Sequence, residues 1–336
     1  MGHFTPERAW IIAEAGVNHD GSLERALALV DAAARCGADA VKFQTFKAAS
    51  LVAMHAPRAP YQGPGDQLSL LRALELGPDA FRALRDRAQQ RGIEFLSTPF
   101  DEESADLLES LGVLRFKVSS GDITDHGLLR RIAQFKKPVI LSTGMARNEE
   151  IADALETLDS CGAPEVTLLH CISSYPACPE ELQLCSIERL RCRFRRRVGF
   201  SDHSIGIEAC LVARALGASV LEKHITLDRR APGPDHAAST EPEEFTRLVQ
   251  TVRLVETMLG GAERTFSATE LANRSAAHKS VVAARRILAG EVLSPTVLAV
   301  RRPGTGIAPR DLPRVVGRAA ARDIPAGEPI RWEMVR

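Results

Sequence analysis

Short runs of β-branched and aromatic residues alternate along the chain with longer stretches in which apolar residues recur every three or four positions. We expect strands at residues 10–13, 40–43, 94–96, 115–118, 139–141, 166–169, 197–200 and 219–221. We expect helices at residues 22–36, 78–91, 102–111, 125–134, 148–161, 179–190, 205–216 and 241–259. Eight strand–helix units in about 260 residues predict an α/β fold, a (β/α)8 TIM barrel, with an open doubly wound sheet as the alternative.

Polar residues stand at or just beyond the end of every predicted strand. They are Glu14, Lys42, Gln44, Thr98, Lys117, Ser120, Ser142, His170, Tyr175, Ser201, His203 and His224. In a barrel the carboxyl ends of all eight strands converge on one face, where active sites are built, whereas an open sheet spreads them along an edge. Each residue alone is equally well explained as a satisfied polar group of the core. Together they favour the barrel and predict a site on this face.

One connection is too long for a tight turn between a strand and a helix. Residues 45–77 include Pro57, Pro60 and Pro64, and long loops in compact domains are usually functional lids or disordered inserts. The position of this loop over the predicted site favours a lid.

The alternation of strands and long helices ends at Gly260 and Gly261, and the residues that follow are richer in short strands, turns and basic side chains. We expect a barrel domain at residues 1–262, a linker at 263–277 and a small β-rich domain at 278–336. Two Ala-Gly-Glu turns, at residues 289–291 and 326–328, lie 37 residues apart and predict a pseudo-symmetric pair of hairpins. Residues 271–336 hold 12 Lys or Arg against 5 Asp or Glu, a surplus that suits docking onto an acidic face or holding an anion.

Composition excludes several classes of protein. Lys plus Arg and Asp plus Glu are both 43, which argues against a nucleic-acid groove, and the 45% hydrophobic content argues against disorder. No uncharged apolar run is long enough to span a membrane, and the first residues lack a signal-peptide core, so we expect a cytoplasmic protein. The seven cysteines include no Cys-x-x-Cys pair, which favours reduced thiols over a thiolate metal site.

The polar strand ends suggest a chemistry. His203 and His224 suit a divalent metal ion with open coordination positions. Lys42 and Lys117, with hydroxyl groups around the ring, suit a phosphate group. The acidic residues Glu14, Asp122 and Asp235 remain for proton transfer or for binding hydroxyl groups. These residues predict a metal-assisted enzyme that acts on a phosphorylated small molecule.

The chain resembles the sialic acid (N-acetylneuraminate) synthase family, the bacterial nonulosonate synthases, over nearly its whole length. The matching motifs lie at residues 11–21, 38–46, 95–101, 116–122, 141–145, 170–176, 199–203, 221–226 and 233–236. Residues 279–283 and 301–306 resemble the antifreeze-protein-like (SAF, β-clip) domain that ends the chains of this family.

The resemblance implies a role for each matched residue. For phosphoenolpyruvate binding the residues are Lys42, Thr98, Lys117, Ser120, Ser142 and Ser201. For amino-sugar binding they are Glu14, Gln44, Tyr175, Asp235 and, from the partner chain of a domain-swapped homodimer, Arg302. His203 and His224 would bind Mn²⁺ or Mg²⁺, and these two residues together with Glu14 and Asp122 would be catalytic.

The resemblance also implies a reaction. Phosphoenolpyruvate would condense with N-acetylmannosamine or a close amino-sugar, and with water, to give an N-acetylneuraminate-type acid and phosphate. Neither a nucleic acid nor a membrane is an expected partner.

The sequence is compatible with more than one acceptor sugar and with more than one function. Residues 273–280 contain no aromatic side chain, although the sialic branch often places one there, so 2,4-diacetamido-2,4,6-trideoxy-mannose is a second candidate acceptor that would give legionaminate. Loop residues such as Tyr61, Gln62 and Gln67 would decide between the two sugars. A synthase acting on a phosphorylated sugar, and a catalytically silent saccharide-binding protein of coat assembly, are also compatible with the sequence.

Overall fold

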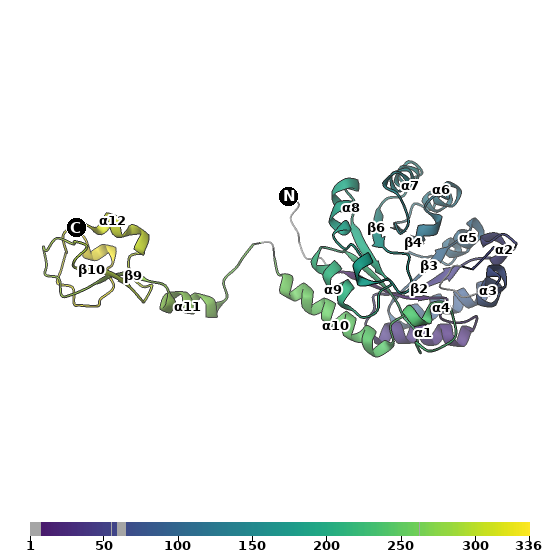
Figure 1. The fold of residues 1–336 in the computed structure, drawn as a ribbon, viewed down its shortest axis with the longest axis horizontal. Coiled ribbons are helices and arrows are strands. Elements are labelled where there is room, and N and C mark those ends of the chain that lie inside the picture. The colour runs from purple at the N-terminus through teal and green to yellow at the C-terminus, as the bar shows by residue number, and fades with distance from the viewer. Residues whose placement is uncertain (1–7, 55, 59–64, 262) are drawn as a thin grey trace. The chain divides into compact units, whose positions relative to one another are not determined.

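Eight parallel strands form the wall of the first of two units in the computed structural model, which describes residues 8–54, 56–58, 65–261 and 263–336 (Figure 1). The strands are β1 (Trp10–Gly16), β2 (Ala40–Thr45), β3 (Glu94–Pro99), β4 (Phe116–Val118), β5 (Val139–Ser142), β6 (Val166–Cys171), β7 (Val198–Asp202) and β8 (Val220–His224). Their order is β3-β2-β1-β8-β7-β6-β5-β4, and β3 contacts β4, which closes the sheet. The predicted (β/α)8 barrel is confirmed.

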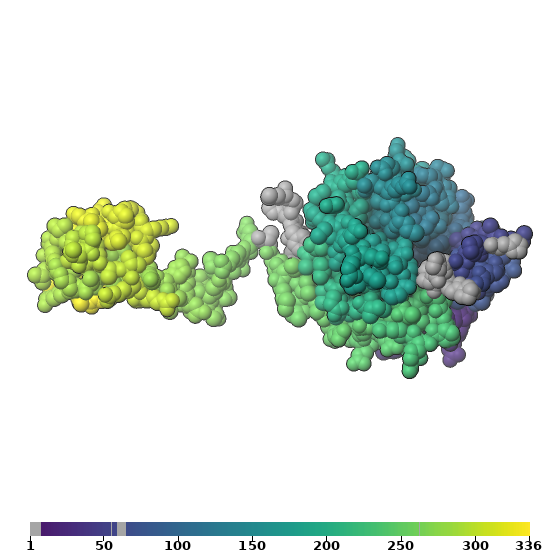
Figure 2. All heavy atoms as spheres, in the orientation of Figure 1, coloured from purple at the N-terminus to yellow at the C-terminus, as the bar shows by residue number. Residues whose placement is uncertain are grey.

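Helices surround the strands, and their side chains fill the space that the ribbons leave open (Figure 2). They are α1 (Leu23–Arg35), α4 (Pro78–Arg91), α5 (Glu102–Ser110), α6 (His126–Gln134), α7 (Asn148–Ser160), α8 (Ser186–Phe194), α9 (Glu208–Ala215) and α10 (Pro242–Leu259). Several begin at a side-chain cap that satisfies free backbone amides, such as Ser22 before α1 and Asp101 before α5. None of the described helices has the length and apolarity needed to cross a bilayer.

The barrel interior has an apolar layer beneath a polar one. The apolar cluster consists of Ile12, Ala40, Leu96, Ile140, Leu169 and Val220. Residues two apart on a strand share a face, so Ile12 is followed by Glu14, Ala40 by Lys42, and Val220 by Glu222. The polar layer therefore lies at the carboxyl ends of the strands, directly above the apolar layer.

The predicted helix at residues 179–190 is wrong in its extent. A short 3₁₀ turn, Pro179–Glu181, and helix α8 occupy this region separately. Gln183 lies between them with a φ of 45°, a left-handed conformation that ends any right-handed helix. Apolar spacing alone does not reveal such a break.

The long connection after β2 carries two helices, α2 (Ala48–Leu51) and α3 (Gln67–Leu74). They pack through a separate apolar cluster that includes Val17, Phe46 and Leu68. Of the loop residues expected to select the sugar, Gln67 begins α3, whereas Tyr61 and Gln62 lie outside the described residues.

The second unit, Glu263–Arg336, has its own apolar core and an antiparallel pair, β9 (Ser280–Ala283) and β10 (Leu298–Arg301). It also contains two helices, α11 (Ala268–Ala277) and α12 (Leu312–Val315). The residues expected to form a linker therefore include a helix.

The two copies of the Ala-Gly-Glu repeat pair with each other. Ile287 and Ile324 are equivalent positions 37 residues apart, and each donates its backbone N–H to the carbonyl oxygen of the other. Gly290 and its equivalent Gly327 both have a φ close to 80°, which glycine adopts without strain. Mutual pairing of equivalent residues is what a local two-fold axis produces, as the repeat predicts.

Candidate active site

A cavity of about 700 Å³ opens at the carboxyl ends of the barrel strands. The predicted site residues that line it are Glu14, Lys42, Gln44, Thr98, Lys117, Ser120, Asp122, Ser142, Tyr175, Ser201, His203, His224 and Asp235. His170 does not line the cavity, because its Nε2–H donates to the carbonyl oxygen of Leu182 at 2.7 Å. Arg302 belongs to the second unit, where it is exposed just beyond β10.

Two lysines and two glutamates form the base of the cavity, all of them almost inaccessible to solvent. Lys42 Nζ lies 2.8 Å from Glu14 Oε2 and 3.6 Å from Glu222 Oε2. It also donates to Thr98 Oγ1 at 3.1 Å. We call Glu14, Lys42, Lys117 and Glu222 the charged floor.

Lys117 lies beside Glu222 as well, near its other carboxylate oxygen. Its Nζ lies 3.9 Å from Glu222 Oε1 and donates to Ser142 Oγ at 2.7 Å. Ser201 Oγ donates to Glu222 Oε1 at 2.8 Å. Each ammonium group therefore has a hydroxyl group beside it, which gives paired donors for an anionic ligand.

The two floor carboxylates have opposite pKa shifts. Burial raises the pKa of Glu14 to about 7, although Lys42 opposes the shift. Burial also acts on Glu222, but the ammonium groups of Lys117 and Lys42 outweigh it and lower its pKa to about 2. A pair of acids whose pKa values are driven apart suits separate roles, with Glu222 a fixed anion and Glu14 able to exchange a proton near neutral pH.

Glu222 is a site residue that was not among those predicted from the sequence, although the motif that contains it was recognised. The signal was present in the period of two along β8. His224 was predicted to point into the barrel, so Glu222, two residues earlier, must point there as well.

Two imidazoles, His203 and His224, lie beside each other at the ends of the paired strands β7 and β8, with ring centroids 5.5 Å apart in an edge-to-face arrangement. The Nδ1 atom of His203 lies 2.7 Å from the carbonyl oxygen of Ile172, so it must carry the hydrogen and leave Nε2 with a lone pair. His224 Nδ1 is buried without a hydrogen-bond partner. Burial lowers the pKa of both side chains, which keeps them neutral.

A neutral imidazole offers a ring-nitrogen lone pair to a divalent metal ion, and the nearest hydroxyl to His203 Nε2 is Ser201 Oγ at 3.5 Å. Among the described residues no group of three or more His, Cys, Asp or Glu is arranged to hold one. His203 and His224 therefore fit an open site, in which substrate and water oxygens would complete the coordination, rather than a closed structural site.

Two further acids lie higher in the cavity. Burial raises the pKa of Asp122 to about 6, and its Oδ2 atom has no hydrogen-bond partner. Burial also raises the pKa of Asp235 to about 6, and its Oδ2 atom lies 3.8 Å from His224 Nδ1. Both acids are placed to accept hydroxyl hydrogens or to exchange protons.

One wall of the cavity is apolar. Helices α2 and α3 and the residue after α2 supply Leu51, Leu71 and Val52, which pack in one cluster with Phe100. Met145, beyond β5, also lines the cavity. Met145 has a φ of 62°, which is uncommon for a residue with a side chain and is often found at functional sites. No periodic pattern in the sequence predicts this wall, since Leu51, Val52 and Leu71 lie in the long connection.

The raised pKa of Asp122 predicts a pH-dependent effect of Asp122→Asn on stability. Folding disfavours the charged carboxylate, so stability that is complete below the ordinary pKa of 3.8 is lost as the pH rises through about 6. The variant should gain about 1–3 kcal/mol in urea unfolding at about pH 8 and lose this gain by about pH 4. The matched variant Asp86→Asn, at an exposed position of α4, should change stability by less than about 0.5 kcal/mol. A gain that is equal at both pH values would contradict the pKa assignment.

Comparison with known proteins places the chain. It is 43% identical to an N,N'-diacetyllegionaminic acid synthase of Legionella pneumophila, with 97% of this chain and 94% of the relative aligned. It is also 43% identical to the N,N'-diacetyllegionaminic acid synthase of Campylobacter jejuni, with 97% and 99% aligned. A sialic acid synthetase of Leptospira borgpetersenii, solved with citrate, is 35% identical with a TM-score of 0.73 and covers 80% of this chain and 90% of its own.

Two family models match separate parts of the sequence. The NeuB family model matches residues 29–264, and the SAF domain model matches residues 278–336. The first covers strands β2 to β8 of the barrel and most of the cavity lining, and the second covers the core of the C-terminal unit. The chain therefore belongs to the NeuB family and is a synthase whose barrel is followed by an SAF domain.

Proposed function

We propose that this chain condenses phosphoenolpyruvate with an N-acetylated amino-sugar and water to give a nonulosonic acid and phosphate. The observation that carries the proposal is the charged floor, in which two buried ammonium groups with adjacent hydroxyls lie close to two neutral imidazoles in one cavity. Phosphate and carboxylate groups are anions that such donors bind, and the aldehyde of an open-chain sugar needs polarising.

The chain's own residues account for binding and charge stabilisation in this reaction. Lys42 and Lys117 would hold the phosphate group and stabilise its charge as it leaves. The methylene carbon of phosphoenolpyruvate forms a bond to the sugar aldehyde carbon, water adds to the resulting cation, and phosphate departs with its bridging oxygen. Glu14 and Asp122 would exchange the protons that these steps require.

His203 and His224 would hold Mn²⁺ or Mg²⁺, which when bound supplies a Lewis acid for the sugar carbonyl. The support is the chemistry of the donor set, two neutral rings. His203 keeps a lone pair on Nε2, and His224 has a buried Nδ1 without a hydrogen-bond partner.

For the sugar we propose 2,4-diacetamido-2,4,6-trideoxy-mannose, with N-acetylmannosamine as the second candidate. The two relatives at 43% identity are named legionaminic acid synthases, whereas the solved sialic acid synthetase is 35% identical. The apolar wall agrees, because the deoxy sugar has a methyl group at C6 and a second acetyl methyl where N-acetylmannosamine has hydroxyl groups. Burial of methyl groups against Leu51, Val52 and Leu71 would favour the deoxy sugar.

A substrate panel tests both parts of this proposal. Phosphate release should occur with phosphoenolpyruvate, Mn²⁺ and the diacetamido sugar, with a kcat/KM at least about tenfold above that for N-acetylmannosamine. The variant Val52→Thr, which has a similar shape but a hydroxyl group, should lower the ratio of the two kcat/KM values. A higher kcat/KM for N-acetylmannosamine would overturn the sugar assignment. Release of phosphate from neither sugar would overturn both candidate acceptors.

We also propose that the synthase works in the cytoplasm as a domain-swapped homodimer, with Arg302 completing the partner's site. The free state of all seven cysteines agrees with a reducing compartment. Arg302 is exposed on a basic unit and can therefore reach an anionic or amide group of a ligand outside that unit.

Mixed dimers test the swapped arrangement. A chain with Arg302→Ala has an intact barrel but a defective contribution to its partner, and a chain with His224→Ala has the opposite defect. Random pairing makes half of the dimers mixed, with one whole site in each, so co-expression should restore about a quarter of the sites. Activity no greater than the sum of the two separate variants, each of them severely impaired, would exclude the swap.

A further inference from the structure

A buried ion pair lies on the outer side of the barrel wall, behind the two imidazoles. Lys223 Nζ is 2.7 Å from Asp202 Oδ2, and their side chains are 1% and 0% exposed. Neither residue lines the cavity. Two fully buried charges are costly to desolvate, and apolar residues of similar volume are often at least as stabilising, so stability alone is a weak explanation for this pair.

The pair is part of a hydrogen-bond network that ties four segments together. Asp202 Oδ1 accepts from the N–H and the hydroxyl of Ser204, at 2.9 and 2.6 Å. Asp202 Oδ2 also accepts from the thiol of Cys210 on α9 at 3.3 Å. Lys223 Nζ donates in addition to the carbonyl oxygen of Ser204 at 2.8 Å. Strands β7 and β8, the turn after β7 and helix α9 are thereby fixed to one another.

The register of the strands places this network directly behind the candidate metal ligands. Asp202 and Lys223 are partners across the parallel β7–β8 pair. Successive side chains on a strand point to opposite faces, so His203 and His224 point into the cavity from the adjacent positions. A shift of either strand end would therefore move one imidazole relative to the other.

We propose that the Asp202–Lys223 ion pair is a positioning device that sets the separation and orientation of His203 and His224. Its bonds are directional, unlike apolar packing, and hold the two strand ends in one register. The inference rests on the proposed function, because it assigns the pair a role in assembling the metal site of that reaction.

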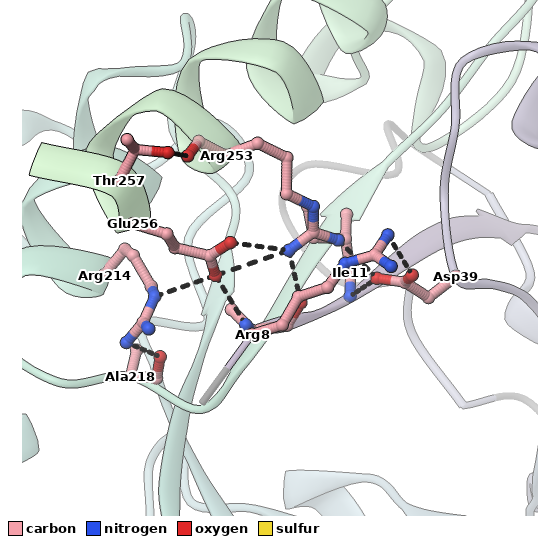
Figure 3. Close-up of polar contacts among 9 residues, drawn as sticks. Arg8, Ile11, Asp39, Arg214, Ala218, Arg253, Glu256 and Thr257 are labelled. Carbon is pink, nitrogen blue, oxygen red and sulfur yellow. Dashed lines mark hydrogen bonds and ion pairs between the residues drawn. The ribbon is translucent and has the colours of Figure 1, made fainter. Parts of the chain in front are cut away.

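The chain contains a matched control for this proposal. Arg214 Nε and Glu256 Oε1 form another buried ion pair, 3.1 Å apart with side chains 3% and 11% exposed (Figure 3). Arg214 lies on the same helix, α9, as Cys210, but its pair joins α9 to α10, and Glu256 also accepts from the backbone N–H of Ala9. This second pair therefore holds the amino-terminal end of the barrel, and neither of its residues lines the cavity.

The test compares Lys223→Met and the double variant Asp202→Asn/Lys223→Met with Arg214→Met and Glu256→Gln/Arg214→Met, all in the full-length chain. Asn keeps an acceptor for Ser204 and removes the unpaired charge, so the double variant guards against simple failure to fold. Thermal unfolding gives stability, and electron paramagnetic resonance gives Mn²⁺ affinity without substrates. His203→Ala serves as the reference for loss of binding.

We expect all four variants to lower the melting temperature, and each double variant to recover part of that loss because it leaves no buried charge unpaired. The Kd for Mn²⁺ should rise about tenfold or more in both Lys223 variants and stay within about twofold in both Arg214 variants. Unchanged Mn²⁺ affinity in the Lys223 variants, or an equal loss in the controls, would overturn the proposal and leave the pair a purely structural role.

A second measurement distinguishes failure of this proposal from failure of the proposed metal site. If the unaltered chain binds no Mn²⁺, the proposed metal site fails, and positioning is then judged from long-range ¹H–¹⁵N spectra of the nine histidine rings. Shifts of the His203 and His224 signals in the Lys223 variants but not in the Arg214 variants would support positioning. Equal spectra would contradict it.

Discussion

The rest of the site depends on four ionisable groups that are almost completely buried at the base of the cavity. Lys42 and Lys117 are held by Glu14 and Glu222 above an apolar layer, and a buried ammonium group persists only when such partners compensate its lost hydration. Because two cations share chiefly one fully ionised partner, Glu222, the floor is electrostatically incomplete and can accept a further anion. The proposed binding of phosphoenolpyruvate follows from this imbalance.

The alternation of side chains along parallel strands organises both faces of the barrel wall. On the inner face it places acids, lysines and imidazoles in one layer above Ile12 and its neighbours. On the outer face of β7 and β8 the same alternation places Asp202 and Lys223, each one residue before an imidazole. The proposed metal ligands and the ion pair that we propose positions them are thus adjacent residues on the same two strands.

Much of this arrangement could be predicted from the sequence, because it depends on local periodicity. Polar residues that interrupt apolar strands, such as Lys42 and Lys117, are costly unless they serve a site, and their convergence followed from the barrel. Glu222 was missed because the predicted strand ended at residue 221, whereas β8 continues to His224 and its period of two places Glu222 on the inner face. The left-handed residue Gln183, which divides a predicted helix, carries no apolar signal. The wall formed by Leu51, Val52 and Leu71 depends on how a long connection folds back, which local pattern does not determine.

The most direct test of the charged floor is the affinity for phosphoenolpyruvate, measured by calorimetry, in Lys42→Met and Lys117→Met. Removing either ammonium group leaves the phosphate without a charged donor worth about 1.5–3 kcal/mol, so each substitution should weaken binding by about tenfold or more. The control Lys47→Met alters a half-exposed lysine paired with Glu75 outside the cavity lining and should leave the affinity unchanged. Unaltered affinity in both floor variants would show that the anion binds elsewhere.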